Sequence, residues 1–360
     1  MTKCVRTALC GTLVLAIASV FPVAAQAATK DVSLGPPTNA QKALQPTASD
    51  VNDFFPHEVR IHVGDKVRFV PNGFHTVDLP GPRTRKLPII TPAAQAITGV
   101  LDAAGAPFWF NGQQQVGFNR RLLTSAFGKS RSYTGSKAVL SGLPLSQRPK
   151  PMTVKFSKAG TFRYFCDVHP GMSGIVRVVS SKSTVPTAAQ DRRTLARQVS
   201  STLATAKKLS STPPPGNNTV DIGAQGKGNV SFFAFIPSTL TVPHGTTVRF
   251  RMNASTEIHT ATIGPGDPEK EPQSYLGQIE AGFQGPLLDP RGAYPSEPPG
   301  ALAALTPTLH GNGFWGSGAL DEDSATRTVP AANAVNFAAP GTYQMFCLIH
   351  PFMHATITVT

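Results

Sequence analysis

The chain has 360 residues, is rich in proline (33) and glycine (32), and has only 15% charged residues. This length is enough for two domains and a linker, and the turn-rich, weakly charged composition excludes a helical bundle and favours β structure. The formal net charge of +13 suits an anionic partner. Nucleic acid is a weak alternative, because the chain carries no nucleic-acid recognition motif.

Residues 1–27 have the pattern of an export signal. Lys3 and Arg6 give a basic start, residues 12–21 are apolar, and Ala25–Ala27 forms a small-residue cleavage motif. The apolar run is too short to span a bilayer comfortably, although an uncleaved anchor is the alternative. We therefore expect a signal peptide at residues 1–27 and a secreted or periplasmic protein of the cell envelope, with no transmembrane segment after cleavage.

A long internal repeat organises the rest of the chain. The stretch VKFSKAGTFRYFCDVHPGMSGIVRV from Val154 aligns without gaps to VNFAAPGTYQMFCLIHPFMHATITV from Val335. The same offset in numbering pairs FFPHEVRIHVGDKVRF from Phe54 with FIPSTLTVPHGTTVRF from Phe235. Both pairs alternate apolar and polar residues as half-buried strands do. Two copies of such a unit predict two similarly folded β domains.

A helix is predicted between the two copies. Leu195, Val199 and Leu203 recur every four residues, as on one face of a helix, and Pro213–Pro215 stiffens the chain that follows. We expect a spacer helix packed on a domain edge rather than a membrane-docking helix. The predicted organisation is a signal peptide at 1–27, a first domain at 28–181, a helical and Pro-rich linker at 182–214 and a second domain at 215–360.

Each predicted domain also contains a long Pro/Gly-rich excursion, at about residues 79–150 and 264–330. Both excursions carry aromatic residues, which fit either anchors that hold a loop to the core or a surface for a partner. We favour the anchor interpretation for these residues: Phe108, Trp109, Phe110, Phe314 and Trp315.

Each copy ends in the same group of potential metal ligands. CDVHPGM and CLIHPFM each place a cysteine, a histidine and a methionine three residues apart after a strand-like run, and a second histidine follows an earlier strand in matched positions. Two imidazoles, a thiolate and a thioether without a carboxylate suit copper, whereas structural zinc favours four cysteines or histidines. The predicted ligand sets are His75, Cys166, His169 and Met172 for one site and His259, Cys347, His350 and Met353 for the other.

A disulfide is the alternative role for Cys166 and Cys347. Cys4 and Cys10 leave with the signal peptide, and two cysteines in an oxidising compartment usually pair. The histidine and methionine beside each remaining cysteine favour a metal instead. Histidines outside these sets are expected to be structural, including His354, which lies close to the second set in sequence; the others are His57, His62, His244 and His310.

Both halves resemble the plastocyanin/azurin group of cupredoxins, and the C-x-x-H-x-x-M loop with proline after the histidine is most similar to that of amicyanin. The resemblance covers about half of each domain and leaves out the long excursions. It implies an all-β fold of two Greek-key β-sandwich cupredoxin domains joined by a short helical linker. It also implies two type 1 copper ions, one per domain, in the two ligand sets given above.

The chain departs from the family pattern at two matched pairs of positions. Thr76 and Thr260 follow the first histidine, where family members usually have an asparagine that braces the ligand loop, so the support of the ligands is open. Val168 and Ile349 stand two residues after the cysteine, where proline is common. These residues keep a backbone N–H that can reach the sulfur, and such a bond is expected to raise the reduction potential relative to amicyanin-like sites.

Three functions fit two cupredoxin domains in one chain: an electron carrier, a copper storage or delivery protein, and a copper oxidoreductase subunit. An oxidase with a second copper centre relays electrons through a histidine beside the type 1 cysteine, but Cys166 lies between Phe165 and Asp167, and Cys347 lies between Phe346 and Leu348. The chain also has no H-x-H pair for a trinuclear cluster. We therefore expect a one-electron carrier and no enzyme, with copper storage as the main alternative.

The distribution of charge indicates the kind of partner. Residues 28–185 carry 20 basic and 8 acidic side chains, whereas residues 212–360 carry 6 basic and 11 acidic ones. The two halves could dock on each other or face different redox proteins, and an acidic redox protein would suit the basic first domain. Contact with an anionic cell surface is an equal alternative.

Overall fold

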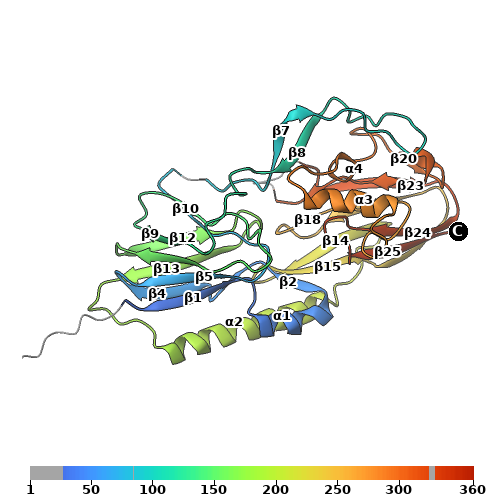
Figure 1. The fold of residues 1–360 in the computed structure, drawn as a ribbon. Helices are drawn as coiled ribbons and strands as arrows, with labels where there is room; N and C mark the ends of the chain where they lie inside the picture. The colour runs from blue at the N-terminus through green and yellow to red at the C-terminus, as the bar shows by residue number, and fades with distance from the viewer. Residues whose placement is uncertain (1–26, 84, 324–328) are drawn as a thin grey trace, which may run out of the picture.

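The computed structural model describes residues 27–83, 85–323 and 329–360, and it forms two β-sandwiches side by side (Figure 1). This confirms the predicted all-β class. The predicted signal peptide lies outside the described residues apart from Ala27. Among the described helices, none is both long and apolar enough to cross a membrane.

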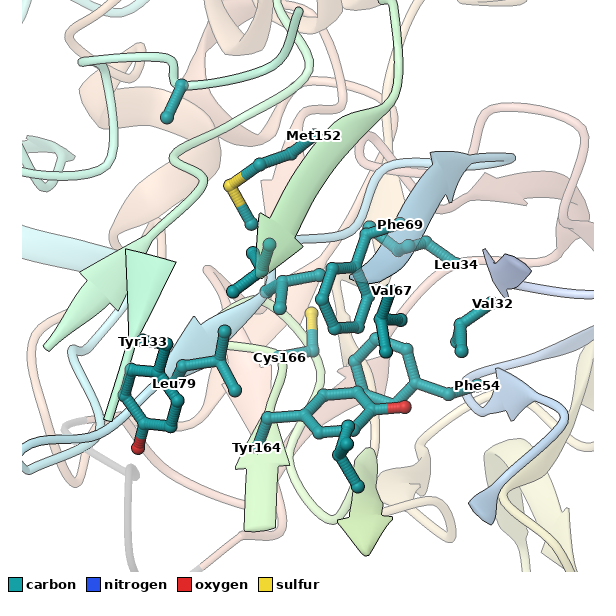
Figure 2. Packing of buried hydrophobic residues seen from close by; sticks show 14 of the residues in the cluster. Val32, Leu34, Phe54, Val67, Phe69, Leu79, Tyr133, Met152, Tyr164 and Cys166 are labelled. Carbon is teal, nitrogen blue, oxygen red and sulfur yellow. The ribbon is translucent and has the colours of Figure 1, made fainter. Parts of the chain in front are cut away.

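Two five-stranded sheets form the N-terminal sandwich, with strand orders β3-β1-β5-β11-β9 and β10-β6-β12-β13-β4. Their bounds are β1 (Thr29–Leu34), β3 (Phe54–Phe55), β4 (Glu58–His62), β5 (Lys66–Pro71), β6 (Asp78–Leu79), β9 (Ser130–Tyr133), β10 (Val139–Leu140), β11 (Met152–Phe156), β12 (Gly160–Phe165) and β13 (Ser173–Val179). Apolar side chains alternate inward along these strands. Tyr164 packs edge-on against Phe54 and Phe69, with ring centroids 4.6 and 5.2 Å away. Figure 2 shows Cys166 among these core residues.

The C-terminal sandwich repeats this plan with a six-stranded sheet, β2-β15-β14-β17-β23-β20, and a five-stranded sheet, β16-β25-β24-β19-β21. Their bounds are β2 (Ser49–Val51), β14 (Thr219–Gly226), β15 (Val230–Ile236), β16 (Thr239–Val242), β17 (Thr246–Met252), β19 (Thr262–Ile263), β20 (Ala303–Leu305), β21 (Trp315–Gly316), β23 (Ala332–Phe337), β24 (Gly341–Phe346) and β25 (His354–Val359). Strands β12 and β24 occupy equivalent positions in the two copies of the sequence repeat. Each pairs antiparallel with the strand that follows the ligand loop.

The two sandwiches share strands and helices. Strand β2 comes from the first half of the sequence, yet it pairs with β15 of the second half. Helix α2 (Ala188–Leu209) begins at a capping box formed by Thr187 and Gln190. Its predicted stripe packs in a cluster with α1 (Thr38–Leu44), β2 and β15. The linker helix is therefore a packed element that contacts both halves.

The excursion of the first half lies over the second half. Its hairpin, β7 (Ile90–Ala96) and β8 (Gln114–Phe118), extends above the C-terminal sandwich in Figure 1. Phe108 and Phe110 are buried in one cluster with Phe314 and with the helix α3 (Tyr275–Ala281). The structure therefore supports the anchor interpretation of these aromatic residues, because their side chains are covered. The remaining elements are η1 (Gln45–Thr47), β18 (Ile258–His259), η2 (Gly282–Gln284), α4 (Pro290–Ala293), η3 (Leu309–Gly311) and β22 (Leu320–Asp321).

A histidine between two carboxylates links the excursions. His310 Nδ1 lies 3.1 Å from Asp102 Oδ2, and its Nε2 lies 2.8 Å from Glu297 Oε1. Burial alone would lower the pKa of His310, but the hydrogen bonds and charges of Glu297 and Asp102 outweigh burial and raise it. The histidine therefore ties Asp102 of the first half to Glu297 of the second half.

Replacing His310 with glutamine should destabilise the metal-free protein more at low pH than at high pH. Because the pKa of His310 is raised on folding, its contribution is complete below about pH 6.5 and is lost as the pH rises through the folded-state value. We expect a loss of about 1 kcal/mol at about pH 5.5 and a smaller loss at about pH 8.5, measured by denaturant unfolding. An equal loss at both pH values would contradict this, and His244→Gln, at an exposed position, is the control.

Candidate metal centres

The structure brings His75, Cys166 and His169 together in a group we call centre 1. The two Nδ1 atoms of the histidines lie 2.9 Å apart, and His169 Nδ1 lies 3.9 Å from the Cys166 Sγ. One ligand atom from each residue lies within 4.8 Å of the other two. Their side chains come from different parts of the sandwich, so the fold itself assembles the group.

Strand ends and a short loop position these side chains. His75 follows β5, and Cys166 comes directly after the last residue of β12. The ligand loop then closes on itself, because the Cys166 N–H donates to the Met172 carbonyl at 3.0 Å and the Met172 N–H donates to the His169 carbonyl at 3.3 Å. Met172, the fourth residue of the predicted ligand set, is buried in the same core cluster as the cysteine.

Centre 2 has the same arrangement. The Nδ1 atoms of His259 and His350 lie 3.0 Å apart, and they lie 3.6 and 3.9 Å from Cys347 Sγ. Its loop closes with the Cys347 N–H on the Met353 carbonyl at 3.1 Å. Phe233 stacks on the ring of His350, with centroids 4.8 Å apart and planes 19° from parallel. The two cysteines are free and buried, so the predicted alternative of a disulfide between them is wrong for this structure.

The chemistry of both groups suits a metal cation. Burial lowers the pKa of His75 and of His350 to about 4, and it lowers those of His169 and His259 well below their usual range. All four imidazoles are therefore neutral near pH 7, with a lone pair free to coordinate. Soft sulfur and intermediate nitrogen donors converge at each centre without a carboxylate, which is a set that copper prefers.

A backbone N–H donates a hydrogen bond to each sulfur. The Thr76 N–H donates to Cys166 Sγ at 3.3 Å, and the Thr260 N–H donates to Cys347 Sγ at 3.4 Å. Burial raises the pKa of both thiols, while these amides and those of Val168 and Ile349 act in the opposite direction. The expected effect of the Val168 and Ile349 amides on the reduction potential stays a prediction.

A threonine braces the ligand loop in each centre. The Thr76 Oγ1 accepts a hydrogen bond from the Asp167 N–H at 2.7 Å, and the Thr260 Oγ1 accepts one from the Leu348 N–H at 2.8 Å. Each threonine therefore binds the cysteine sulfur through its backbone N–H, and through its hydroxyl it binds the residue that follows the cysteine. In both centres, these two contacts tie the segment that carries His75 or His259 to the ligand loop.

The ring of His75 lies against backbone that only glycine allows. Gly73 has φ +128°, and a Cβ there would lie 2.9 Å from both Cδ2 and Nε2 of the ring. Gly35 has φ +92°, and a Cβ there would lie 3.0 Å from the same Nε2. These two glycines shape the pocket that fixes the orientation of His75.

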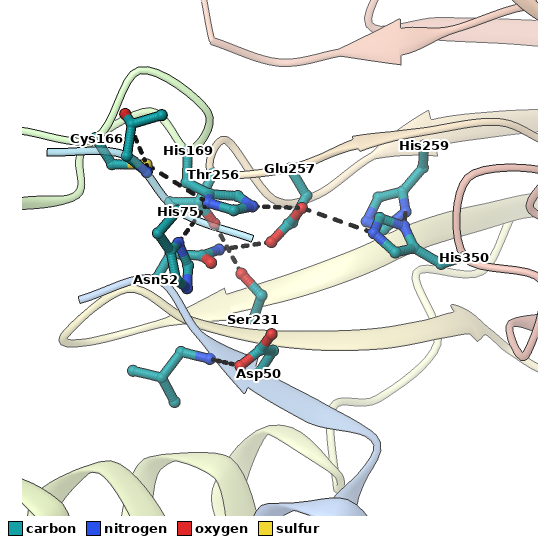
Figure 3. Close-up of polar contacts among 12 residues, drawn as sticks. Asp50, Asn52, His75, Cys166, His169, Ser231, Thr256, Glu257, His259 and His350 are labelled. Carbon is teal, nitrogen blue, oxygen red and sulfur yellow. Dashed lines mark hydrogen bonds and ion pairs between the residues drawn. The ribbon is translucent and has the colours of Figure 1, made fainter. Parts of the chain in front are cut away.

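A glutamate that the sequence did not single out lies between the centres. Glu257 Oε2 lies 3.8 Å from His169 Nε2 of centre 1 and 4.0 Å from His350 Nε2 of centre 2 (Figure 3). Asn52 donates its Nδ2–H to Glu257 Oε1 at 2.5 Å. Burial raises the pKa of Glu257 to about 8, and the bond from Asn52 partly offsets that effect. Sequence reasoning missed Glu257 because its partners come from opposite copies of the repeat.

The other histidines belong to neither group. His57 Nδ1 contacts Asp53 Oδ1 at 3.0 Å, and His62 Nε2 contacts the Ser183 carbonyl at 2.8 Å. His354 is exposed, and its Nδ1 lies 3.2 Å from the Phe352 carbonyl. These contacts agree with the structural roles expected for them.

No protein-family model matches the chain, and no curated protein matches it. Solved structures that match include a mutant plastocyanin of fern at 18% identity, covering 39% of this chain and 99% of that one. A reduced mutant of amicyanin is 15% identical, and the match covers 39% of this chain and 80% of that one. A purple cupredoxin from Nitrosopumilus maritimus is 16% identical, and the match covers 39% of this chain and 98% of that one. The TM-score is 0.21 for all three. Similarity at this level establishes neither a family nor a function for this chain.

Gly73→Ala should disturb centre 1 alone. The added Cβ would meet the His75 ring at 2.9 Å, so the ring must turn away from Cys166 and His169. We expect copper affinity at centre 1 to fall about tenfold or more while centre 2 is unchanged, as measured by metal titration. Gly64→Ala is the matched control, because Gly64 has φ +94° but an added Cβ there would meet no atom within 4 Å. Equal affinities in the two variants would contradict the proposed packing.

Thr76→Val and Thr260→Val should each destabilise the protein. Valine keeps the shape but removes the hydroxyl that accepts the buried N–H of Asp167 or Leu348. Leaving a buried donor unpaired costs about 1–3 kcal/mol, which denaturant unfolding can measure. Thr161→Val, at an exposed position of β12, should cost much less. Equal losses at exposed and buried positions would contradict the bracing role.

Proposed function

We propose that this chain is an exported blue copper protein with two type 1 copper sites, which carries single electrons between redox partners. The observation that supports this most strongly is the repeated convergence of two imidazole Nδ1 atoms and one buried sulfur. Copper bound by such donors cycles between Cu(I) and Cu(II), and so accepts and releases one electron. His75, Cys166 and His169 would hold it in centre 1, with Met172 as the fourth ligand.

Centre 2 would hold the second ion through His259, Cys347 and His350, with Met353 as the fourth ligand. In both centres the cysteine sits at a strand end and its loop is closed by backbone hydrogen bonds. Such support keeps the donors in place through a change of oxidation state, which suits electron transfer. We propose tandem cupredoxin domains at residues 28–181 and 215–360, with the linker at 182–214.

Exposed aromatic rings beside the centres suit a docking partner. Phe74 precedes His75 and is 44% exposed, and Phe352 lies 6.1 Å from the ring of His350 and is 46% exposed. We propose that redox proteins approach at these rings, and that an acidic protein prefers the basic first half. The proposed location is the cell envelope, after removal of residues 1–27.

Purified mature protein should bind two equivalents of Cu(II) and turn intensely blue, because thiolate-to-copper charge transfer absorbs strongly. Cys166→Ser and Cys347→Ser should each remove about half of this absorption, since each removes the thiolate of one centre. Each variant is the matched control for the other. Weak colour combined with tight Cu(I) binding would contradict the carrier and favour a copper store.

A further inference from the structure

Glu257 lies beside one histidine of each centre. It directly precedes β18, the short strand that carries the centre 2 residue His259, while its carboxyl group also reaches His169 of centre 1. The Nε2 atoms of His169 and His350 lie 3.8 and 4.0 Å from the same oxygen, Glu257 Oε2. The ligand loops of the two halves therefore face each other across this one side chain (Figure 3).

Groups from both halves hold Glu257 in place. Asn52 comes from the first half, donates to Glu257 Oε1, and is itself fixed by its N–H on the Asn229 carbonyl at 2.9 Å. On the other side, the preceding residue Thr256 shares a 2.7 Å hydroxyl contact with Ser231. Glu257 and Asn52 are buried. A carboxyl group fixed in this way presents its second oxygen to the two histidines.

The chemistry of a ligating histidine requires such a neighbour. In each centre the Nδ1 atoms face the sulfur, so a neutral imidazole that coordinates through Nδ1 carries its proton on Nε2. Metal-bound histidines usually donate this second N–H to a carboxylate or carbonyl, which orients the ring. A shift of about 1 Å or less would bring each Nε2 within hydrogen-bond distance of Glu257 Oε2.

The other histidine of each centre, His75 or His259, has no carboxylate beside its Nε2 atom among the contacts of the described residues. Among the described residues, His75 Nε2 and His259 Nε2 are buried and have no hydrogen-bond partner. Outer support from a carboxyl group is thus confined to one ligand of each centre, and both depend on the same oxygen atom. A change at this one position should reach both metals.

We propose that Glu257 is a positioning residue common to both copper centres, which orients His169 and His350 together and makes the two centres a coupled pair. This inference rests on the proposed copper function. It assigns the contact between the two halves a role in metal binding, in addition to holding the sandwiches together.

The test measures the Cu(I) affinity of each centre separately, by titration against a chromophoric Cu(I) chelator. Cys347→Ser leaves centre 1 intact and Cys166→Ser leaves centre 2 intact. Adding Glu257→Leu to either variant should lower the affinity of the remaining centre by about 10–100-fold. Glu257→Gln has a single acceptor oxygen to share between Asn52 and the two histidines, so it should restore affinity only in part. Glu297→Gln is the matched control, because Glu297 also contacts a histidine but His310 belongs to neither centre.

Loss of affinity at both centres supports the proposal, whereas loss at one centre or at neither overturns it. If Glu257→Leu does not fold, Asn52→Ala decides, because it frees Glu257 without removing it and should weaken both centres severalfold. Unchanged affinity in that variant also overturns the proposal. If neither single-centre parent binds copper, the proposed function itself fails and this inference fails with it; copper binding that is insensitive to Glu257 overturns this inference alone.

Discussion

The placement of a buried sulfur at the end of a strand is the constraint on which each centre depends. Cys166 and Cys347 are fixed by their strands, by a loop-closing hydrogen bond to the methionine carbonyl, and by the N–H of the threonine after the first histidine. The rest of each sandwich holds these groups in place. The donors are thus brought together by hydrogen bonds and packing that belong to the protein itself, which reduces the rearrangement that metal binding requires.

Much of this could be predicted from the sequence because the signals are local or repeated. Alternating apolar residues predicted the strands, and the constant offset between the two copies predicted two similar folds. The same offset identified both C-x-x-H-x-x-M loops, and the structure brings the cysteine and two histidines of each set within 4.8 Å. Residues 195–203 predicted a packed helix, which the structure confirms as part of α2.

Other features depend on contacts between the halves, which no repeat or period encodes. The pairing of β2 with β15 places a short segment of the first half in a sheet of the second. The first excursion lies over the second half through Phe108 and Phe110. Glu257 belongs to neither predicted ligand set, so the repeat does not point to it. Its contacts with His169 and His350 arise only because the fold brings these two histidines together. The bracing role of Thr76 and Thr260 was likewise open, because a hydroxyl and an amide side chain differ in reach.

Anomalous diffraction at the copper absorption edge, from crystals of the copper-loaded mature protein, tests the central claim most directly. The account predicts two separate copper peaks, one bounded by His75, Cys166 and His169 and the other by His259, Cys347 and His350. A single peak beside Glu257, or no peak near either sulfur, would contradict it.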